Sequence, residues 1–475
     1  MRKFVLLLPL ALAACAVGPQ YTRPDTHAPE AFDRFDAAEY STDVPIVDFW
    51  TQFNDPLLNQ LVVDALAANH DLRIAAARME QARQIARVAR HDYFPTVTSS
   101  ASYTDARIPA ADAFGANQSF DTEVYDVGFD VFWELDLFGR VRRANQAQTA
   151  EFEASEADLA GAQVSVASEV ARLYFILRGS QEQLRVAAEN ADNQRSSLDL
   201  TQVRLDAGSG TEFDTARATA QLHQTLARIP AFQTAVAASI HAIGVLTGRE
   251  PQVLRAELER DQSMPELPAL TAVGSPEALL RRRPDIASAE RRLAASTARI
   301  GVEVADLFPR ITLGQGFGWA ATDFDDLGDD GTERWALGPF ISWPAFDLGR
   351  VRARVGAANA DTNAALASYE QTVLRALEET ETGLARYANQ RHEVAELDAS
   401  ANASEDAARL ARLRFEGGVA DFLQVLDAER TQLEAQDRLV TSRTLRATTL
   451  IAVYKAMGSP FPPSAALMEK ATEKR

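Results

Sequence analysis

Two long stretches of the sequence contain no proline, and this constrains the fold more than any other feature. One lies between Pro109 and Pro230, and the other between Pro344 and Pro460. Both are rich in Ala, Leu, Arg, Gln and Glu, which are strong helix formers, whereas proline is excluded from helix interiors. The sequence therefore predicts two very long helices.

The first helix is expected from about Arg140 to Leu205, which corresponds to roughly 100 Å at 1.5 Å per residue. Glycines at 208 and 210 then permit a tight turn into a return helix. The second half repeats this arrangement, with a long helix from about Arg350, a turn at 416–420 and a return helix to about Met457. Apolar residues in the first helix recur with a period of 3.5, as in a coiled-coil seam. They are Val166, Val170, Leu173, Leu177, Leu184, Ala187, Ala191, Leu198 and Leu205.

The sequence also matches itself at a displacement of about 210 residues, which is too long for a solenoid repeat and indicates two equivalent halves. The predicted divisions are a signal peptide at 1–14, an N-terminal segment at 15–56, a first repeat at 57–248, a linker at 249–274, a second repeat at 275–457 and a tail at 458–475. The matching segments are Trp133–Arg142 with Trp343–Arg352, Tyr93–Pro95 with Leu307–Pro309, and Arg204–Gly208 with Arg414–Gly418.

Two segments with alternating polarity precede each long helix. Strands are expected at about 96–104, 124–136, 310–320 and 334–346. In Tyr125–Leu135 every odd position is apolar, and most even positions are acidic or Gly, which indicates a strand with one apolar face. A soluble antiparallel sheet packed on a helix would give the same alternation.

Strand length and aromatic residues favour a membrane barrel over the soluble sheet. Each strand is about nine to eleven residues long, the length of a transmembrane strand. Four strands cannot close a barrel, because the smallest transmembrane barrels have about eight. The chain must then oligomerise, and twelve strands from three copies or sixteen from four would both satisfy closure. The expected aromatic girdle consists of Tyr125, Trp133, Trp319, Trp335 and Trp343.

The N-terminus has the features of an export signal. Arg2 and Lys3 precede the apolar run Phe4–Leu12, which is too short to span a bilayer. Leu12–Cys15 resembles a bacterial lipobox, in which Cys15 is acylated, for example with palmitate, and anchors the protein to a membrane. Ala16 rather than Asp follows the cysteine, which by resemblance to bacterial lipoproteins implies the outer membrane. An ordinary cleavage site beside a chance cysteine is the alternative.

Composition excludes several classes of function. The 48 Lys and Arg are outnumbered by 67 Asp and Glu, so nucleic-acid binding is not expected. A single Cys rules out an intramolecular disulfide, and the six His lack the spacing of a helical metal motif. No nucleophile and base pair or phosphate loop is visible. We therefore expect neither an enzyme nor any cofactor besides the covalent lipid on Cys15.

Several motifs resemble those of the TolC-like outer-membrane factors, specifically the NodT family of efflux lipoproteins. Val17–Pro24 resembles the opening signature, and Phe49–Leu57 the next block. The most specific match runs from Arg282–Ile286 through Ala289–Leu293 to Ile300–Val302 and Phe308–Pro309. The resemblance covers nearly all of the mature chain.

The resemblance implies an α+β membrane protein that forms a homotrimer. Twelve strands, four from each chain, would form an outer-membrane barrel that continues into a periplasmic α-helical coiled-coil barrel, with a small mixed equatorial region. It also implies a passive exit duct for small toxic compounds in a tripartite pump. Its partners would be a periplasmic adaptor, an inner-membrane RND transporter and outer-membrane lipids.

A duct of this kind must be closed when no pump is attached, and the hairpin tips are the expected place. Val425–Ala428 resembles the family segment whose Asp ring narrows the aperture, so Asp427 is the first gate candidate. Asp421 lies nearly two turns earlier and would form a second ring, and Gln424 occupies a position that is Asp in some relatives. An acid in the first turns of a helix is also favoured by the helix dipole alone.

The turns and the barrel interior supply the other candidate sites. By resemblance, adaptor hairpins would dock at the tips, although the glycines there are also explained by the turn itself. Asp126, Asp130 and Glu134 are expected to face the barrel lumen. These carboxylates predict weak cation selectivity. The net charge, which changes from −19 to −21 on removal of Arg2 and Lys3, supports the same prediction. The docking candidates are Gly208, Ser209, Gly210, Thr211, Gly417, Gly418, Val419 and Ala420.

Two further functions fit part of the sequence. A TolC-like duct for secreted proteins shares the architecture, but lipidation and the Arg282–Ile286 motif favour efflux. A lipid-anchored periplasmic coiled-coil adaptor or scaffold would need neither the aromatic-rimmed strands nor the duplication. The acidic segment 322–331 lacks the glutamate that ends an EF-hand loop, and we interpret it as a solvated loop outside the cell.

Overall fold

The structure is a computed structural model that describes residues 16–26, 28–33, 41, 43, 48–109, 119–260, 262–270 and 272–458. The proposed lipid attachment site, Cys15, lies outside the described residues. The chain divides into two compact units. Unit 1 contains the described residues up to Asp25 with 78–156 and 288–370, and unit 2 contains 26–77, 157–287 and the described residues from 371 onward.

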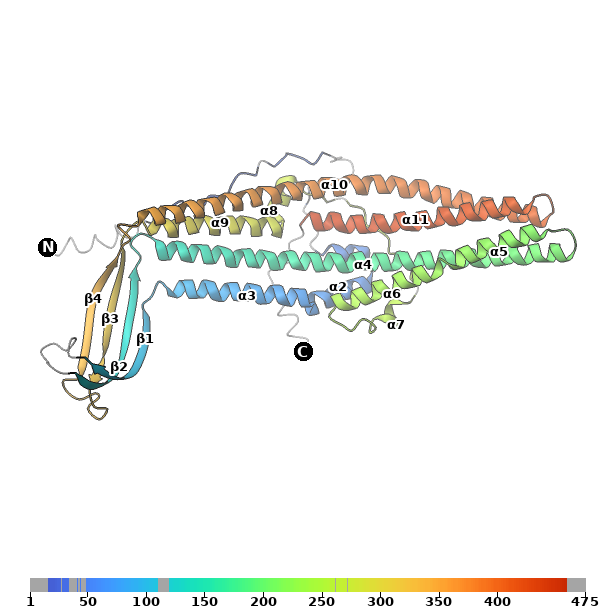
Figure 1. Ribbon diagram of the computed structural model, residues 1–475. Helices are drawn as coiled ribbons and strands as arrows, with labels where there is room; N and C mark the ends of the chain where they lie inside the picture. Colours follow the sequence, from blue (N-terminus) through green and yellow to red (C-terminus); the bar gives the residue numbers. More distant parts are fainter. Residues whose placement is uncertain are drawn as a thin grey trace. The chain divides into compact units, whose positions relative to one another are not determined.

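Unit 1 contains a four-stranded antiparallel sheet, in which the strands follow one another in chain order (Figure 1). The strands are β1 (Thr96–Ile108), β2 (Phe120–Leu135), β3 (Arg310–Ala321) and β4 (Glu333–Ser342). β1 and β2 extend four residues farther than expected. In their added ends polar residues occupy the odd positions, whereas Ile108 and Phe120 occupy even ones, which reverses the alternation of the rest of these strands. The ladder nevertheless continues, and Arg107 pairs with Asp121 at 3.5 Å.

The sheet has two chemically different faces, because the register aligns odd positions with odd positions across all four strands. The odd-numbered positions form the apolar face, on which Val127, Phe129 and Val131 lie beside Phe317 and Leu313. All the strand glycines have even numbers, so we call the even-numbered side the glycine face. They are Gly128, Gly314, Gly316, Gly318 and Gly338.

The strands join the helices at two equivalent junctions. After β2, the carboxylate of Asp136 accepts hydrogen bonds from the backbone N–H groups of Val141 and Arg142, at 3.0 and 2.9 Å. These are N–H groups that a helix leaves unsatisfied at its start, so Asp136 fixes where α4 (Arg140–Asp206) begins. The rings of Phe138 and Phe308 stack at 4.6 Å, which connects the junctions of the two halves.

Tryptophan anchors both junctions in the same way. The indole Nε1 of Trp133 donates to the carbonyl of Tyr93 at 3.0 Å, and that of Trp343 donates to the carbonyl of Leu307 at 3.1 Å. The duplication seen in the sequence is therefore repeated in hydrogen bonds. β4 ends at Ser342, so Trp343 lies just beyond the strand that was expected to include it.

The helices of unit 1 are portions of four long elements that run side by side (Figure 1). They are the part of α3 (His70–His91) from residue 78, the first part of α4, the part of α9 (Pro284–Ala305) from residue 288, and the first part of α10 (Leu348–Glu416). A break at Arg283 separates α9 from the preceding short helix, α8 (Pro276–Arg282). Arg283 is extended, with ψ of 124°, because a following proline disfavours helical backbone.

Unit 2 contains two helical hairpins and a set of shorter helices. α4 turns back into α5 (Glu212–Leu226) and α6 (Ile229–Leu246), and α10 turns back into α11 (Phe422–Ala456). Pro230, in the first turn of α6, accompanies the break between α5 and α6. The shorter elements are η1 (Phe49–Phe53), α2 (Pro56–Ala68), α7 (Arg255–Leu258) and α8 (Pro276–Arg282).

Aromatic side chains form the core beside η1. The ring of Phe49 stacks on Tyr454 at 5.2 Å, and that of Phe53 packs against Phe175 at 4.9 Å. The nearby hydroxyl of Tyr174 donates to Asp55 at 2.5 Å, and burial raises the pKa of this phenol. The Phe49–Leu57 motif therefore attaches the start of the chain to α4 and α11 within unit 2.

Candidate functional site

The two hairpin tips have the same backbone structure. Gly208 and Gly418 have φ values of 69° and 74°, the left-handed conformation that glycine adopts without strain. In the first tip the N–H of Ser209 donates to the carbonyl of Arg204 at 2.9 Å, and in the second Val419 donates to Arg414 at 3.0 Å. Both turns are Schellman-type helix ends. A Cβ on Gly208 or Gly418 would touch nothing within 4 Å, so both turns are open to solvent in this chain.

A polar and aromatic contact joins the two tips. The guanidinium of Arg204 lies 4.0 Å from the centre of the Phe415 ring and donates a hydrogen bond to the Phe415 carbonyl. Phe415 also packs with Phe422, Val425 and Ala218, which brings α10, α11 and α5 into one cluster. The contact between Arg204 and Phe415 therefore links the end of the first long helix to the end of the second.

The predicted gate residues have different environments. Asp421 is the N-cap of α11, and its Oδ1 accepts from the backbone N–H of Gln424 at 3.1 Å. Asp427 has an exposed side chain, at 67%, and pairs with Arg430 one turn away at 2.8 Å. Thr211 occupies the equivalent N-cap position of α5 in the first tip. Helix capping alone therefore accounts for Asp421, and no gate role is needed to explain it. The exposed Asp427 remains the gate candidate.

A line of polar contacts connects α4 with α11 behind the tips. Ser197 donates to the carboxylate of Glu429 at 2.7 Å, and Asn190 donates to Gln436 at 2.8 Å. The Glu429 side chain is only 3% exposed, and the nearest cation, Arg412, is 3.8 Å away. Burial raises the pKa of this carboxyl, opposed by the Ser197 hydrogen bond and the Arg412 charge. The helix pair that includes the gate candidate thus contains a buried acid.

The proposed lumen carboxylates all lie on the glycine face, but two of them are paired. Arg334 Nη2 lies 2.6 Å from Asp126 Oδ1, and Arg140 Nε lies 2.7 Å from Glu134 Oε1. No ion pair involving Asp130 is found among the described residues. Of the three predicted lumen acids, Asp130 is thus the one without an ion-pair partner in the described part of the chain.

The proposed girdle residues divide into two levels on the apolar face. Tyr125, Trp319 and Trp335 lie toward the strand ends far from the helices, and Trp133 lies near the helix junction with Trp343 just beyond β4. Tyr125 and Trp133 are eight residues apart on β2, which corresponds to roughly 26 Å of strand. That separation matches the apolar band of an outer-membrane barrel, about 25 Å.

The N-terminal segment is attached beside the junction of the sheet and helices. The N–H of Val17 donates to the carbonyl of Phe138 at 3.0 Å. Arg143 donates to the carbonyls of Val17 and Gly18, both at 3.2 Å. Gly18 packs so closely on Gly301 that a Cβ there would lie 2.5 Å from the Gly301 Cα. The chain that follows Cys15 is thereby fixed at the end of β2.

The Arg282–Ile286 motif has a structural role in unit 2. Arg283 donates to the carbonyl of Ala456 at 2.9 Å and pairs with Asp285 and Glu379 at 2.7 and 2.8 Å. The guanidinium therefore caps the C-terminal end of α11 while holding α10. The two segments can approach closely because residue 458 is glycine; a Cβ on Gly458 would lie 2.6 Å from the Arg283 side chain.

Comparison with known proteins agrees with this geometry. The family model described as "Outer membrane efflux protein" matches residues 61–249 and 275–459, one match in each half. The chain belongs to this family. It is 31% identical over 464 residues to outer membrane protein OprJ of Pseudomonas aeruginosa, covering 98% of this chain and 96% of OprJ. It is 30% identical over 417 residues to the toluene efflux pump outer membrane protein TtgI of Pseudomonas putida, covering 87% of each.

Solved structures of outer-membrane channels have the same fold. The outer-membrane channel OprN is 42% identical, with a TM-score of 0.89, covering 94% of this chain and 99% of that one. The open-state MtrE channel of Neisseria gonorrhoeae is 27% identical, with a TM-score of 0.84, covering 94% and 98%. The predicted TolC-like fold, efflux function and outer-membrane location are therefore confirmed.

Three features of this efflux channel were not predicted from its sequence. Arg334 was not recognised as the partner of Asp126, although its even position in β4 places it on the glycine face. Glu429 resembles any other helix acid in sequence, and only the packing of α4 on α11 reveals its burial. Arg204 was recognised as part of the repeated tip motif, but not as a contact to Phe415.

Proposed function

We propose that this efflux channel is the trimeric exit duct of a tripartite pump. Small toxic compounds would pass from an inner-membrane RND transporter and a periplasmic adaptor through the helical barrel and the outer-membrane barrel. The observation that carries the proposal is the sheet itself. Among the described residues, the edge strands β1 and β4 each pair with a single strand. The apolar face is exposed, for example Trp335 at 76%.

Closure of a barrel from several copies explains why the outer edges of β1 and β4 have no further strand partner among the described residues of one copy. A transmembrane strand must satisfy its backbone hydrogen bonds within the protein, so an open edge is not stable in a membrane. Three copies supply twelve strands, a number within the range of transmembrane barrels. The apolar face then meets lipid, and the glycine face, with Asp126, Asp130 and Glu134, lines the lumen.

The tips support a gate and a docking function in the proposed duct. Asp427 from three copies would form an exposed carboxylate ring close to the tip, while Asp421 and Gln424 shape the start of the same helix. The open turns at 208–211 and 417–420 would receive the adaptor. A bulky substitution at Ser209, which is exposed, is expected to impair efflux without loss of trimer.

Lipidation of Cys15 is part of the same proposal. Val17 and Gly18 are held at the end of β2, so an acyl group on Cys15 would lie near the periplasmic membrane surface. Cys15→Ser should remove the acyl mass from the mature protein. Because the barrel also inserts in the membrane, the variant should remain in the outer-membrane fraction.

Disulfide trapping between the edge strands tests the trimer. Cysteine pairs are introduced on the glycine face of β1 and β4, for example Ser100→Cys with Ala336→Cys and with the residues next to Ala336 in register. Because Cys15 is the only native cysteine, a disulfide between the strands can form only through the introduced cysteines or Cys15. Oxidation should give covalent trimers from at least one register that retain drug efflux when expressed with an adaptor and transporter. Covalent dimers or tetramers as the largest closed product would overturn the twelve-stranded barrel.

A further inference from the structure

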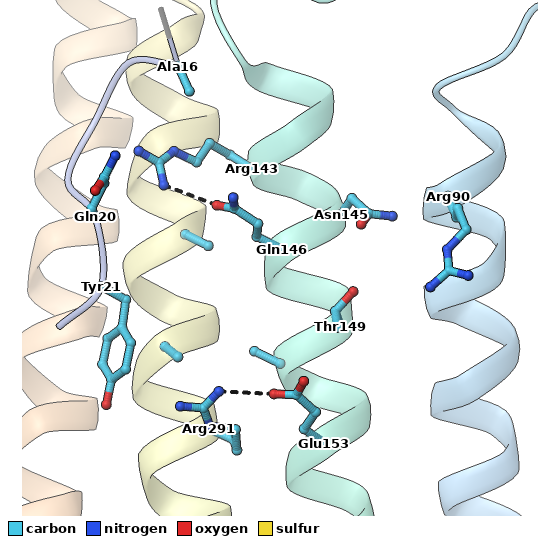
Figure 2. Close-up of a pocket in the computed structure, with 13 residues that line it drawn as sticks. Ala16, Gln20, Tyr21, Arg90, Arg143, Asn145, Gln146, Thr149, Glu153 and Arg291 are labelled. Carbon is cyan, nitrogen blue, oxygen red and sulfur yellow. Dashed lines mark hydrogen bonds and ion pairs between the residues drawn. The ribbon is translucent and has the colours of Figure 1, made fainter. Parts of the chain in front are cut away.

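Unit 1 contains a cavity of about 730 Å³ where the N-terminal segment meets the helices (Figure 2). Its wall is formed by the end of α3, the first turns of α4 and the side of α9, with Ala16 at one edge. The alanines Ala150, Ala294 and Ala298 form a small apolar floor. None of the sites discussed above uses this space.

The cavity has an excess of positive charge in a chain whose net charge is −19. Three arginines line it, and among the described residues only Arg291 pairs with carboxylates, Glu153 at 3.0 Å and Glu290 at 2.5 Å. Arg143 is 4% exposed, and its hydrogen bonds go to neutral oxygens, including Gln146 Oε1 at 3.0 Å. For Arg90 the described part of the chain provides no ion-pair partner.

Unsatisfied hydrogen-bond donors accompany the charge. The side-chain Nδ2 of Asn145 is buried and has no acceptor. Figure 2 shows Asn145 and Thr149 extending from α4 on the side that faces α3, from which Arg90 extends toward them. A buried donor without an acceptor costs free energy, on the order of 1–3 kcal/mol. An anionic acceptor in the cavity would recover this cost.

The position of the cavity indicates the source of the anion. Arg143 follows the end of β2 by eight residues, and Arg90 precedes the start of β1 by six. In the proposed duct these strands cross the outer membrane, so the cavity lies at its periplasmic surface. Ala16 lines the cavity and is next in sequence to the proposed acylated Cys15. Phospholipid headgroups are the anions present at that depth.

We propose that this cavity binds the phosphate group of an anionic phospholipid from the periplasmic leaflet. Arg90 supplies the charge, because a guanidinium donates several hydrogen bonds to phosphate oxygens. The buried Arg143 adds positive charge from the other side of α4. Asn145 and Thr149 donate further hydrogen bonds, and the alanine floor accommodates the glycerol part. The proposal rests on the membrane orientation of the proposed duct. Basic pockets beside membrane segments bind lipid headgroups in the same way.

Native mass spectrometry of the full-length channel tests the site. Phosphatidylglycerol should be retained by the wild type, and phosphatidylcholine with the same acyl chains should not. Arg90→Gln combined with Asn145→Ala should weaken phosphatidylglycerol binding at least about tenfold. Arg87→Gln is the matched control, because Arg87 lies one turn earlier on α3 and bonds to Gln84 instead of lining the cavity.

Each other outcome overturns the proposal. Equal retention of both lipids would show that the cavity does not select an anionic headgroup over a zwitterionic one. Equal binding by wild type and the double variant would show that Arg90 and Asn145 do not hold the lipid. If inorganic phosphate alone displaces phosphatidylglycerol at low concentration, the site serves a free anion rather than a lipid. Trimer formation and bilayer conductance of the same samples report separately on the proposed duct, so failure of that proposal is distinguishable.

Discussion

The guanidinium of Arg334 binds the carboxylate of Asp126 although the two residues lie on strands that are not neighbours. The Nη2 to Oδ1 distance is 2.6 Å, and the side chain crosses β3 to reach β2. Gly318 is the register partner of Arg334, and a Cβ on Gly128 would lie 3.0 Å from its Nη2. The glycines therefore let the arginine lie against the sheet instead of projecting from it.

This arrangement predicts opposite changes in ion selectivity. Asp126→Asn would leave Arg334 uncompensated and shift the reversal potential in a salt gradient toward anions. Arg334→Gln would leave Asp126 and Asp130 without a cation and shift it toward cations. The double variant restores the charge balance and should return close to the wild-type value. Planar bilayer recordings measure all three, and equal reversal potentials for both single variants would contradict a lumen position.

A buried carboxyl predicts the pH dependence of stability. The pKa of Glu429 is raised by burial, so the folded protein holds this proton more tightly than the unfolded chain. The stability that the protonated Glu429 contributes is present below the ordinary pKa of 4.5, and it is lost as the pH rises through the raised pKa of the folded state. Glu429→Gln should therefore gain thermal stability relative to wild type as pH increases above about 4.5.

The exposed Glu434 on the same helix gives the control for this pH series. Glu434→Gln should change the melting temperature much less than Glu429→Gln, because the Glu434 side chain is exposed and its substitution removes no buried contact. A melting difference between Glu429→Gln and wild type that does not change with pH would show that folding leaves the pKa of this carboxyl unchanged.

Arg283 should contribute much more to stability than its neighbour Arg281. Arg283 is buried and binds the carbonyl of Ala456 and the carboxylates of Asp285 and Glu379. Because the two acids are half-exposed, their ion pairs are screened by solvent, and Arg283→Met should lower the free energy of unfolding by about 2 kcal/mol. Arg281 makes one exposed pair with Glu277, and Arg281→Ala should cost less than about 0.5 kcal/mol. Chemical denaturation of both variants tests the difference, and equal midpoints would contradict the structural role of Arg283.

The contact between Arg204 and Phe415 should hold the tips closed. Arg204→Ala removes both the ring contact and the hydrogen bond, roughly 1–2 kcal/mol in each copy. The expected result is a larger bilayer conductance and greater entry of a bulky antibiotic into cells. Gln202→Ala is the control, because the side chain of Gln202 donates to Asp206 within its own helix. Equal conductance in the two variants would place the restriction elsewhere.

Local patterns predicted the elements of the fold well. Alternation identified the faces of β2 and β3, and proline-free stretches identified α4 and α10, because periodicity and backbone restriction act along the chain. The tips were predicted from glycine at Gly208 and Gly418, where the structure requires positive φ. The outer ends of β1 and β2 were missed because their polar residues lie at odd positions, which reverses the alternation of the rest of the strands.

Contacts between distant residues could not be predicted in the same way. Ser197 and Glu429 are 232 positions apart, and their hydrogen bond depends on the packing of α4 on α11. The Arg334 partner of Asp126 depends on strand order and on glycine in the intervening strand. The sequence placed Asp427 ahead of Asp421 only by resemblance to a family segment, whereas the structure distinguishes their environments: Asp421 caps α11, and the exposed Asp427 pairs with Arg430.

Single-channel conductance in planar bilayers tests the central claim, a membrane duct restricted at its periplasmic tips. The comparison should include wild type, Asp427→Ala and Asp421→Asn, because asparagine preserves the N-cap of α11. We expect a small conductance for wild type, a larger one for Asp427→Ala and little change for Asp421→Asn. Inserted protein that forms no channel, or a conductance unaffected by Asp427→Ala, would contradict a duct that is gated by this carboxylate.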